Sequence, residues 1–265
     1  MKQLLTLALA CMLFTACKKE TEKTTEDTTE TTVAEGLKLA LATKEYSQTS
    51  KVGCRDTLCT YVRISVPEAS GLGDVSDSIN NKVFHVARSI VYFGEKPTNA
   101  KSYKELMASF IKSYEELQKD SSESFPWEAK ISARVDYMSD SIINIKMNNY
   151  MFTGGAHGYE GNRSLLFNAK TGRSLTYNDI FKDKSAFTAF VEKKFREKYK
   201  IAAGKSINST GLMFIDDKFI LPQNIFYTDK GILLLYNAYE VASFADGTKE
   251  ILIPYREANA FLKVK

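Results

Sequence analysis

The chain has 265 residues, with 36 basic and 32 acidic side chains and a formal net charge of +4. This near balance, without a basic block interleaved with aromatic residues, argues against a nucleic-acid-binding protein. Once the N-terminal segments are set aside, roughly 230 residues remain, enough for one large domain or two small domains with a proper core.

The N-terminus has the pattern of a secretion signal. Lys2 gives a basic start, and the apolar run Leu4–Phe14 that follows is too short to span a bilayer. Cys17 ends the motif "LFTAC" like the cysteine of a bacterial lipobox, although Phe14 stands where Leu, Val or Ile is usual. We predict a signal peptide over residues 1–16 and a membrane anchor on acylated Cys17. An ordinary cleaved signal is the alternative.

The segment 17–35 is predicted to be a disordered tether. Its sequence "KKETEKTTEDTTETT" offers no apolar side chain whose burial could offset the entropy lost on ordering. Its first residues also resemble the lysine-and-acid export tag of surface lipoproteins. No later segment is long and apolar enough to cross a bilayer. We therefore expect a lipoprotein of the outer membrane or cell surface, on the periplasmic face or the exterior, and not a cytoplasmic protein.

Two cysteines remain beyond the N-terminal segments. Cys54 and Cys59 lie close together in "GCRDTLCTY", and outside the cytoplasm such a pair is typical of a disulfide. The alternative, a zinc site, needs more ligands than the chain offers nearby, because His85 and His157 are distant in sequence. We predict a disulfide that closes a hairpin loop, with no metal and no other cofactor.

Period-two alternation and helical spacing of apolar residues predict the elements that follow. In chain order these are strand 37–46, strand 61–66, helix 76–90, helix 102–117, strand 129–137 and strand 143–147. Pro67 to Gly73 interrupts the second strand pattern. Ser102-x-x-Glu105 forms a capping box at the start of the second helix. His85 lies beside the apolar stripe of the first helix, and we interpret it as a partly buried structural residue.

The chain continues with a hairpin in which Gly172 supplies the positive φ of a tight turn. The later elements are expected as helix 186–199, strand 225–227, strand 232–236 and strand 251–253. Pro254 suits the first position of a short closing helix that reaches Leu262. Because helices do not alternate regularly with strands, we predict an α+β fold. Its antiparallel sheets are built from hairpins, with three main amphipathic helices and a short C-terminal helix.

The segment "YMFTGGAHGYEG" is the candidate functional loop. Glycine is favoured where φ is positive or another backbone comes close, so its glycines predict a shaped loop between two hairpins. The candidate binding residues are Gly154, Gly155, His157, Gly158 and Tyr159. Three roles stay open for His157: a structural residue bonded to loop carbonyls or a neighbouring tyrosine, a ligand contact, or a general base.

The sequence does not supply partners for catalysis by His157. It has no G-x-S-x-G nucleophile motif, no second histidine at metal-ligand spacing and no free cysteine beyond the signal. Asp216 and Asp217 are adjacent, and neighbours in an extended segment point to opposite faces, so they form a poor acid–base pair. We predict no catalytic residue.

Aromatic residues flank the loop and recur in the C-terminal strands. Half of each alternating set must face the core, and the remainder can form a surface for sugars or proteins. They are Tyr150, Phe152, Tyr159, Phe226, Tyr227, Tyr236 and Tyr239.

Three segments together carry a family resemblance: "INNKV", "YMFTGGAHGYEGNRSLLFNAKTGRSLTYNDIF" and "YNAYEVASFADGTKEILIPY". In order and spacing they resemble bacterial envelope proteins that pair a DUF4163 (PdaC-type) domain with a DUF3298 domain. The resemblance implies domains at 36–157 and 158–265. Members include the extracellular part of a lysozyme-binding anti-sigma factor and the accessory region of a peptidoglycan deacetylase. The sigma-binding and deacetylase segments of those proteins have no counterpart in this sequence.

The leading functional hypothesis is a non-enzymatic envelope lipoprotein that recognises a wall-directed protein such as lysozyme, or peptidoglycan. It is what the resemblance implies, combined with the predicted lipid anchor. Two alternatives stay open: a wall-modifying hydrolase that uses His157, and a structural partner in envelope assembly.

Overall fold

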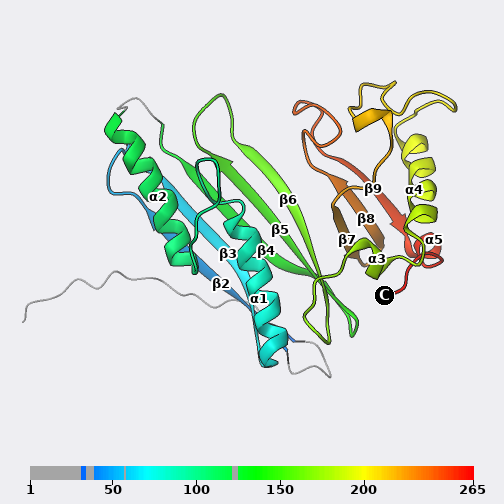
Figure 1. Cartoon of the computed structure of the whole chain (residues 1–265), viewed down its shortest axis with the longest axis horizontal. Helices are drawn as coiled ribbons and strands as arrows, with labels where there is room; N and C mark the ends of the chain where they lie inside the picture. The colour runs from blue at the N-terminus through cyan, green and yellow to red at the C-terminus, as the bar shows by residue number, and fades with distance from the viewer. Residues whose placement is uncertain (1–30, 34–38, 57, 121–124) are drawn as a thin grey trace, which may run out of the picture.

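The computed structural model describes residues 31–33, 39–56, 58–120 and 125–265. Two sheets lie next to each other, each accompanied by helices (Figure 1). The two sheets are mostly antiparallel, and this mixed architecture confirms the predicted α+β class. The predicted signal peptide 1–16 and the predicted acylation site Cys17 lie outside the described residues.

The first sheet contains six strands within the described residues, in the order of the chain. They are β1 (Thr31–Val33), β2 (Ala40–Thr49), β3 (Tyr61–Ser70), β4 (Glu128–Met138), β5 (Ile142–Phe152) and β6 (Tyr159–Asn168). Neighbours pair antiparallel except β3 and β4, which are parallel because two helices carry the chain back between them. The strands predicted from period-two alternation in this half are confirmed.

Two details of this sheet differ from the sequence-based expectation. Thr31–Val33 fall in the predicted tether, yet they pair with the start of β2, because main-chain hydrogen bonds need no apolar side chain. The pattern also predicts an interruption at Pro67, whereas β3 continues to Ser70. Beyond Ser65, β3 pairs with β2 alone, and a strand with one free edge tolerates a residue without an N–H group.

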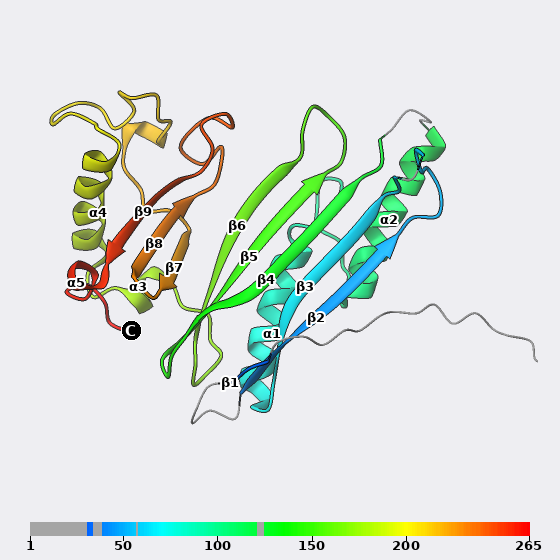
Figure 2. The ribbon, with the colours of Figure 1, turned by 180° about the vertical axis from the view of Figure 1, so that it is seen from behind.

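Helices α1 (Gly73–Arg88) and α2 (Tyr103–Asp120) cover one face of the first sheet (Figure 1), and the view from behind shows the other face without helices (Figure 2). We call this other face the open face. Alternation sends apolar side chains towards the helices, where they form the first core. The strand residues of that core include Val62, Ile64, Val66, Ala129, Ile131, Ala133, Ile143, Ile145 and Met147.

The capping box of α2 forms in modified shape. The Glu105 N–H donates to Ser102 Oγ at 3.2 Å, as predicted, but the Glu105 carboxylate accepts from the N–H of Lys101 (2.8 Å) and not from that of Ser102.

No helix in the described part of the chain is both long and apolar enough to cross a bilayer.

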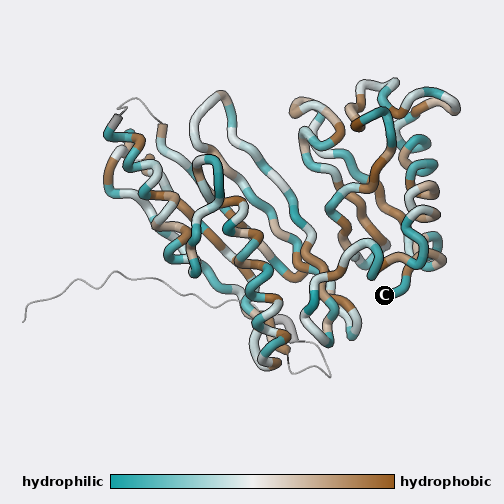
Figure 3. Tube along the Cα trace, in the orientation of Figure 1, coloured by the Kyte–Doolittle hydropathy of each residue, from teal (hydrophilic) through white to brown (hydrophobic). Residues whose placement is uncertain are grey.

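The second sheet is a three-stranded meander, counted over the described residues. Its strands are β7 (Asn224–Thr228), β8 (Gly231–Tyr236) and β9 (Lys249–Pro254), and the elements around it are α3 (Tyr177–Ile180), α4 (Lys184–Lys198), η1 (Ile215–Asp217) and α5 (Tyr255–Ala258). The strands are largely hydrophobic, whereas α4 is mostly hydrophilic along its length (Figure 3). Phe187, Val191 and Phe195 turn the apolar side of α4 inward, as predicted.

Pro254 takes a different place from the predicted one. It ends β9 and precedes α5 as the capping residue, so it is not the first residue of the helix. The helix ends at Ala258, short of Leu262, because Leu262 instead bridges to Phe181.

The predicted domain boundary between residues 157 and 158 falls at the turn between β5 and β6, whereas the chain leaves the first sheet only after Asn168.

Asparagine side chains join the two sheets. Asn144 is fully buried, and its Oδ1 accepts from the N–H of Tyr227 (2.8 Å) while its Nδ2 donates to Ser164 Oγ (3.0 Å). Nearer the end of β8, the side chain of Asn237 accepts from the N–H of Asn162 (2.7 Å) and donates to the carbonyl of the same residue (3.1 Å). These amides satisfy main-chain groups that no strand ladder pairs at the junction.

Replacing Asn144 with leucine tests this junction. Leucine has a similar size but leaves the buried N–H of Tyr227 without an acceptor, at a cost of about 1–3 kcal/mol. We expect the free energy of unfolding to fall by about 2 kcal/mol, measured by urea unfolding. Asn178→Leu, at an exposed position, is the control and should change stability by less than about 0.5 kcal/mol. Equal effects of both variants would rule out a special role for Asn144.

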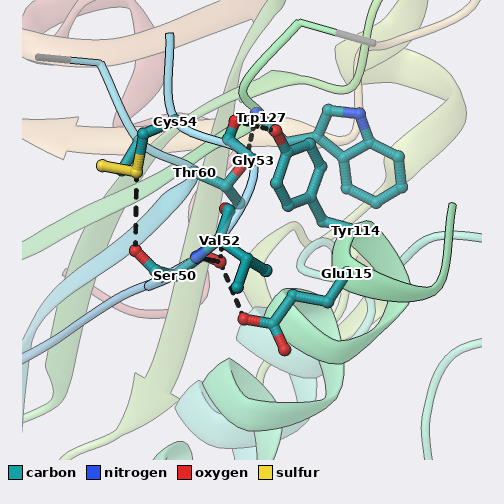
Figure 4. Close-up of a disulfide and its surroundings, with 9 residues drawn as sticks. Ser50, Val52, Gly53, Cys54, Thr60, Tyr114, Glu115 and Trp127 are labelled. Atoms are coloured by element: carbon teal, nitrogen blue, oxygen red, sulfur yellow. Dashed lines mark hydrogen bonds between the residues drawn. A yellow bond between two sulfur atoms is a disulfide. The ribbon is translucent and has the colours of Figure 1, made fainter. Parts of the chain in front are cut away.

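The predicted disulfide between Cys54 and Cys59 is present in the loop that connects β2 and β3 (Figure 4). The loop docks on α2 through the Tyr114 hydroxyl, which donates to the carbonyl of Gly53. Gly53 has φ +68°, and a Cβ there would lie 2.6 Å from the Tyr114 hydroxyl oxygen, so only glycine fits both constraints. The disulfide thus shapes a loop that is also held by the helix layer.

Removing the disulfide should destabilise the protein without changing its fold. For a loop this short, the chain entropy regained in the unfolded state corresponds to about 2 kcal/mol. We expect this decrease for the double variant Cys54→Ser/Cys59→Ser in urea unfolding followed by circular dichroism. Dithiothreitol should reproduce the decrease in the wild type and leave the double variant unaffected. A wild type insensitive to the reductant would contradict the prediction.

Candidate functional site

The predicted loop is the tip of the β5–β6 hairpin. Gly154 (φ +103°) and Gly155 (φ +89°) both lie in the left-handed region that disfavours other residues. A Cβ at either position would meet no atom within 4 Å. Backbone conformation, not lack of space, therefore requires this glycine pair.

Gly158 is required for the opposite reason, lack of space. A Cβ there would lie 2.5 Å from the ring of Tyr150, so the loop backbone rests directly on that ring.

The Tyr150 ring also belongs to a row of side chains on the open face. Lys130 Nζ lies 5.1 Å from the Tyr150 ring centroid and 5.2 Å from that of Tyr61. Hydrogen bonds to Tyr61 and Glu128 raise the pKa of Lys130 and keep it charged. We call Tyr61, Lys130 and Tyr150 the tyrosine–lysine row; it crosses the open face towards the hairpin tip.

His157 lies exposed at the tip, with two contacts that orient its ring. Its Nδ1 is 2.8 Å from the carbonyl oxygen of Gly158, and its imidazole stacks on Phe244 at 4.0 Å between centroids and 12° between planes. Phe244 in turn stacks on Tyr239 at 5.5 Å and 28°. We call these three residues the tip cluster. It joins a hairpin of the first sheet to the loop between β8 and β9 of the second.

The tip cluster is a surface feature, and sequence reasoning missed one of its members. Phe244 is 39% exposed and Tyr239 is 57% exposed, whereas the other aromatic residues singled out in the C-terminal strands, Phe226, Tyr227 and Tyr236, are buried in the core. One signal marks Phe244 in the sequence: it is a large apolar residue inside the turn-rich segment "VASFADG" between two strands.

Within the described residues, no carboxylate is hydrogen-bonded to His157, and no three His, Cys, Asp or Glu side chains are close enough to hold a metal ion. Asp216 and Asp217 lie in η1 and not in an extended segment. Asp217 Oδ1 accepts from the N–H of Asn208 at 3.2 Å and so serves its own loop. The geometry therefore gives His157 the loop contact of the structural role and an exposed ring for a ligand.

The other histidine differs from its predicted environment. We predicted His85 to be partly buried, but it is exposed on α1, with Nδ1 3.0 Å from the Arg88 guanidinium. The buried stripe of α1 passes through Ile79, Val83 and Ala87, and a residue midway between the last two faces away from the sheet.

Tyr159, the last of the five predicted binding residues, does not join the tip cluster. It begins β6 and pairs with Met151, on the side of the sheet that carries the helices. There it lines a cavity together with Asn149 and Arg163. The predicted set thus divides between the exposed tip and a separate hollow, and a binding role for either part stays a prediction.

Two segments of the chain match known families. Residues 54–160 match the family described as deacetylase PdaC, and residues 178–256 match DUF3298, described as a protein of unknown function. No curated protein matches the chain. These matches confirm the PdaC-type and DUF3298 parts of the resemblance.

Solved structures of DUF3298 family proteins share the fold. A crystal structure from Bacteroides fragilis has 23% sequence identity and a TM-score of 0.62, over 84% of this chain and 93% of that one. A second, from Pseudomonas aeruginosa, has 22% identity and a TM-score of 0.59, over 84% of this chain and 94% of that one. The chain therefore contains a segment that matches PdaC followed by one that matches DUF3298, on the fold seen in solved DUF3298 family proteins.

Proposed function

We propose that the protein is a non-enzymatic recognition module of the cell envelope that binds peptidoglycan. The alternative ligand is a wall-directed protein such as lysozyme. The PdaC-type and DUF3298 matches support an envelope role, because the sequence resembles envelope proteins that pair these two domains. The predicted acylation of Cys17 would hold the module on a membrane and is part of the same proposal.

The observation that carries the proposal is the exposed tip cluster. Exposing apolar rings to water is unfavourable, and an exposed group of them is often a binding surface. The rings of the tip cluster are flat and can stack on flat apolar faces such as those of sugar rings. The tip cluster is also fixed in place: Gly158 rests on Tyr150, and the His157 ring is oriented by its own loop. A surface that is already ordered loses little entropy when a ligand binds.

Charge favours peptidoglycan over a basic protein as the first ligand. Glu128 balances the charge of Lys130 in the tyrosine–lysine row at 2.9 Å, so the cation offered to a ligand on this face is Arg63, 4.8 Å from the Tyr61 ring. Peptidoglycan carries carboxylates on its peptides, whereas lysozyme is itself cationic and would be repelled here.

The test is binding to purified peptidoglycan. Phe244→Ala removes the central ring of the tip cluster, and we expect affinity to fall roughly three- to tenfold, the range for losing one stacked aromatic contact. Co-sedimentation with insoluble peptidoglycan measures this affinity, and an immobilised-lysozyme assay runs in parallel. Phe125→Ala, at an exposed aromatic residue outside the tip cluster, is the matched control.

The outcomes separate the hypotheses. Loss of peptidoglycan binding in Phe244→Ala but not in Phe125→Ala supports the proposal, and binding to neither ligand by the wild type refutes it. Release of soluble fragments from peptidoglycan, abolished by His157→Ala at unchanged melting temperature, would instead establish the hydrolase alternative.

A further inference from the structure

A cavity lies on the side of the first sheet that carries the helices, separate from the tip cluster. Its volume is about 530 Å³, within the range of roughly 300–1,000 Å³ usual for small-molecule sites. One wall is the segment that follows α1, from Ser89 to Gly94, and the other is formed by β5 and β6. It exists because the helix layer stops short of the hairpin end of these two strands.

An unpartnered buried amide lines this cavity. Asn149 is 4% exposed, and its Oδ1 has no hydrogen-bond partner in the described part of the chain. The other buried asparagines of β5 and the junction, such as Asn144 and Asn237, bond to main-chain groups. A buried polar group without a partner is destabilising, so its presence beside a cavity points to a partner supplied from outside the chain.

The space around the amide depends on Gly161. A Cβ at this position would lie 3.1 Å from Asn149 Oδ1 and 3.1 Å from the ring of Tyr159. Any other residue would press against both side chains, whereas glycine lets the amide and the ring approach the same strand. The cavity is therefore shaped by a specific residue in β6.

Arg163 gives the cavity a positive charge. It is half-buried, and its Nη1 donates to the carbonyl of Asn162 at 3.0 Å, which orients the guanidinium. Within residues 39–56, 58–120 and 125–265, no carboxylate forms an ion pair with Arg163. An oriented, half-buried guanidinium that lacks an acidic partner is suited to bind a carboxylate.

Aromatic and apolar side chains complete the lining. Tyr92, Phe93 and Tyr159 surround the cavity with Met151, and the Phe93 ring is held against Trp127 at 4.4 Å between centroids. Such rings provide flat apolar surface next to polar groups. The combination of guanidinium, amide and aromatic surface matches a ligand that is ring-shaped, rich in hydroxyls and negatively charged.

We propose that this cavity binds a sugar that carries a carboxylate, of the uronic acid class. Arg163 pairs with the carboxylate, the Asn149 amide bonds to a ring hydroxyl, and the aromatic side chains cover the apolar face of the ring. The tip cluster takes no part in this site, so the inference stands independently of the proposed function.

The test compares glucuronate with glucose, which differ at one carbon, and with acetate, which has the charge but no ring. The probe is added to the full-length chain, and amide signals of Asn149 and Gly161 are followed by nuclear magnetic resonance. We expect saturable binding of glucuronate, weakened at least about tenfold in Arg163→Gln, the usual effect of losing a charged hydrogen bond. Arg256→Gln, at an exposed position on α5 beside the second sheet, is the matched control and should leave affinity unchanged.

Asn149→Leu separates a ligand role from a structural one. Removing an amide whose oxygen has no partner among the described residues should leave the melting temperature unchanged or raise it, while glucuronate binding falls at least about tenfold. A drop in melting temperature would show that the amide serves the fold, and would overturn its assignment. Equal affinity for glucose and glucuronate, equal affinity for acetate, or no saturable binding would each overturn the proposal, whether or not the leucine variant folds.

Discussion

The relative position of the two sheets depends on asparagine side chains that act in place of a strand ladder. Neither sheet continues into the other, so the main-chain groups that face the junction need partners from elsewhere. Asn144 supplies an acceptor to Tyr227 of β7, and Asn237, just after β8, supplies one to Asn162 of β6. An amide presents a donor and an acceptor side by side, as a peptide group does, and can therefore dock one backbone on another without a shared register.

The tip cluster follows from this docking. Asn237 bonds to Asn162, a few residues beyond the hairpin tip, and the loop that starts at Asn237 contains Phe244. The stacking of Phe244 on His157 is therefore set by the same contact that fixes the second sheet. The tip cluster therefore draws its residues from both matched segments, His157 from the one that matches PdaC and Tyr239 and Phe244 from the one that matches DUF3298.

Local patterns in the sequence predicted much of this structure. Alternation located the long strands, because successive side chains of a half-buried strand point in turn to the core and to the other face. The spacing of Cys54 and Cys59 indicated their disulfide. The features that escaped prediction depend on distant parts of the chain. β1 pairs with β2 through its main chain, His85 is exposed through its angle on α1, and Phe244 meets His157 only after both sheets have formed. Asn149 likewise meets the segment 89–94 across the cavity only in the folded chain.

The register of the first sheet places β1 and the hairpin tip at opposite ends of the strands. Strand β1 pairs with the beginning of β2, which lies opposite Ser70 at the end of β3, whereas Tyr61 at the start of β3 aligns with Glu128 and Phe152 beside the hairpin tip. The ten residues of β3 separate these two ends by roughly 30 Å. The chain thus enters the first sheet at one end and carries the tip cluster at the other, with the full length of the strands between the two.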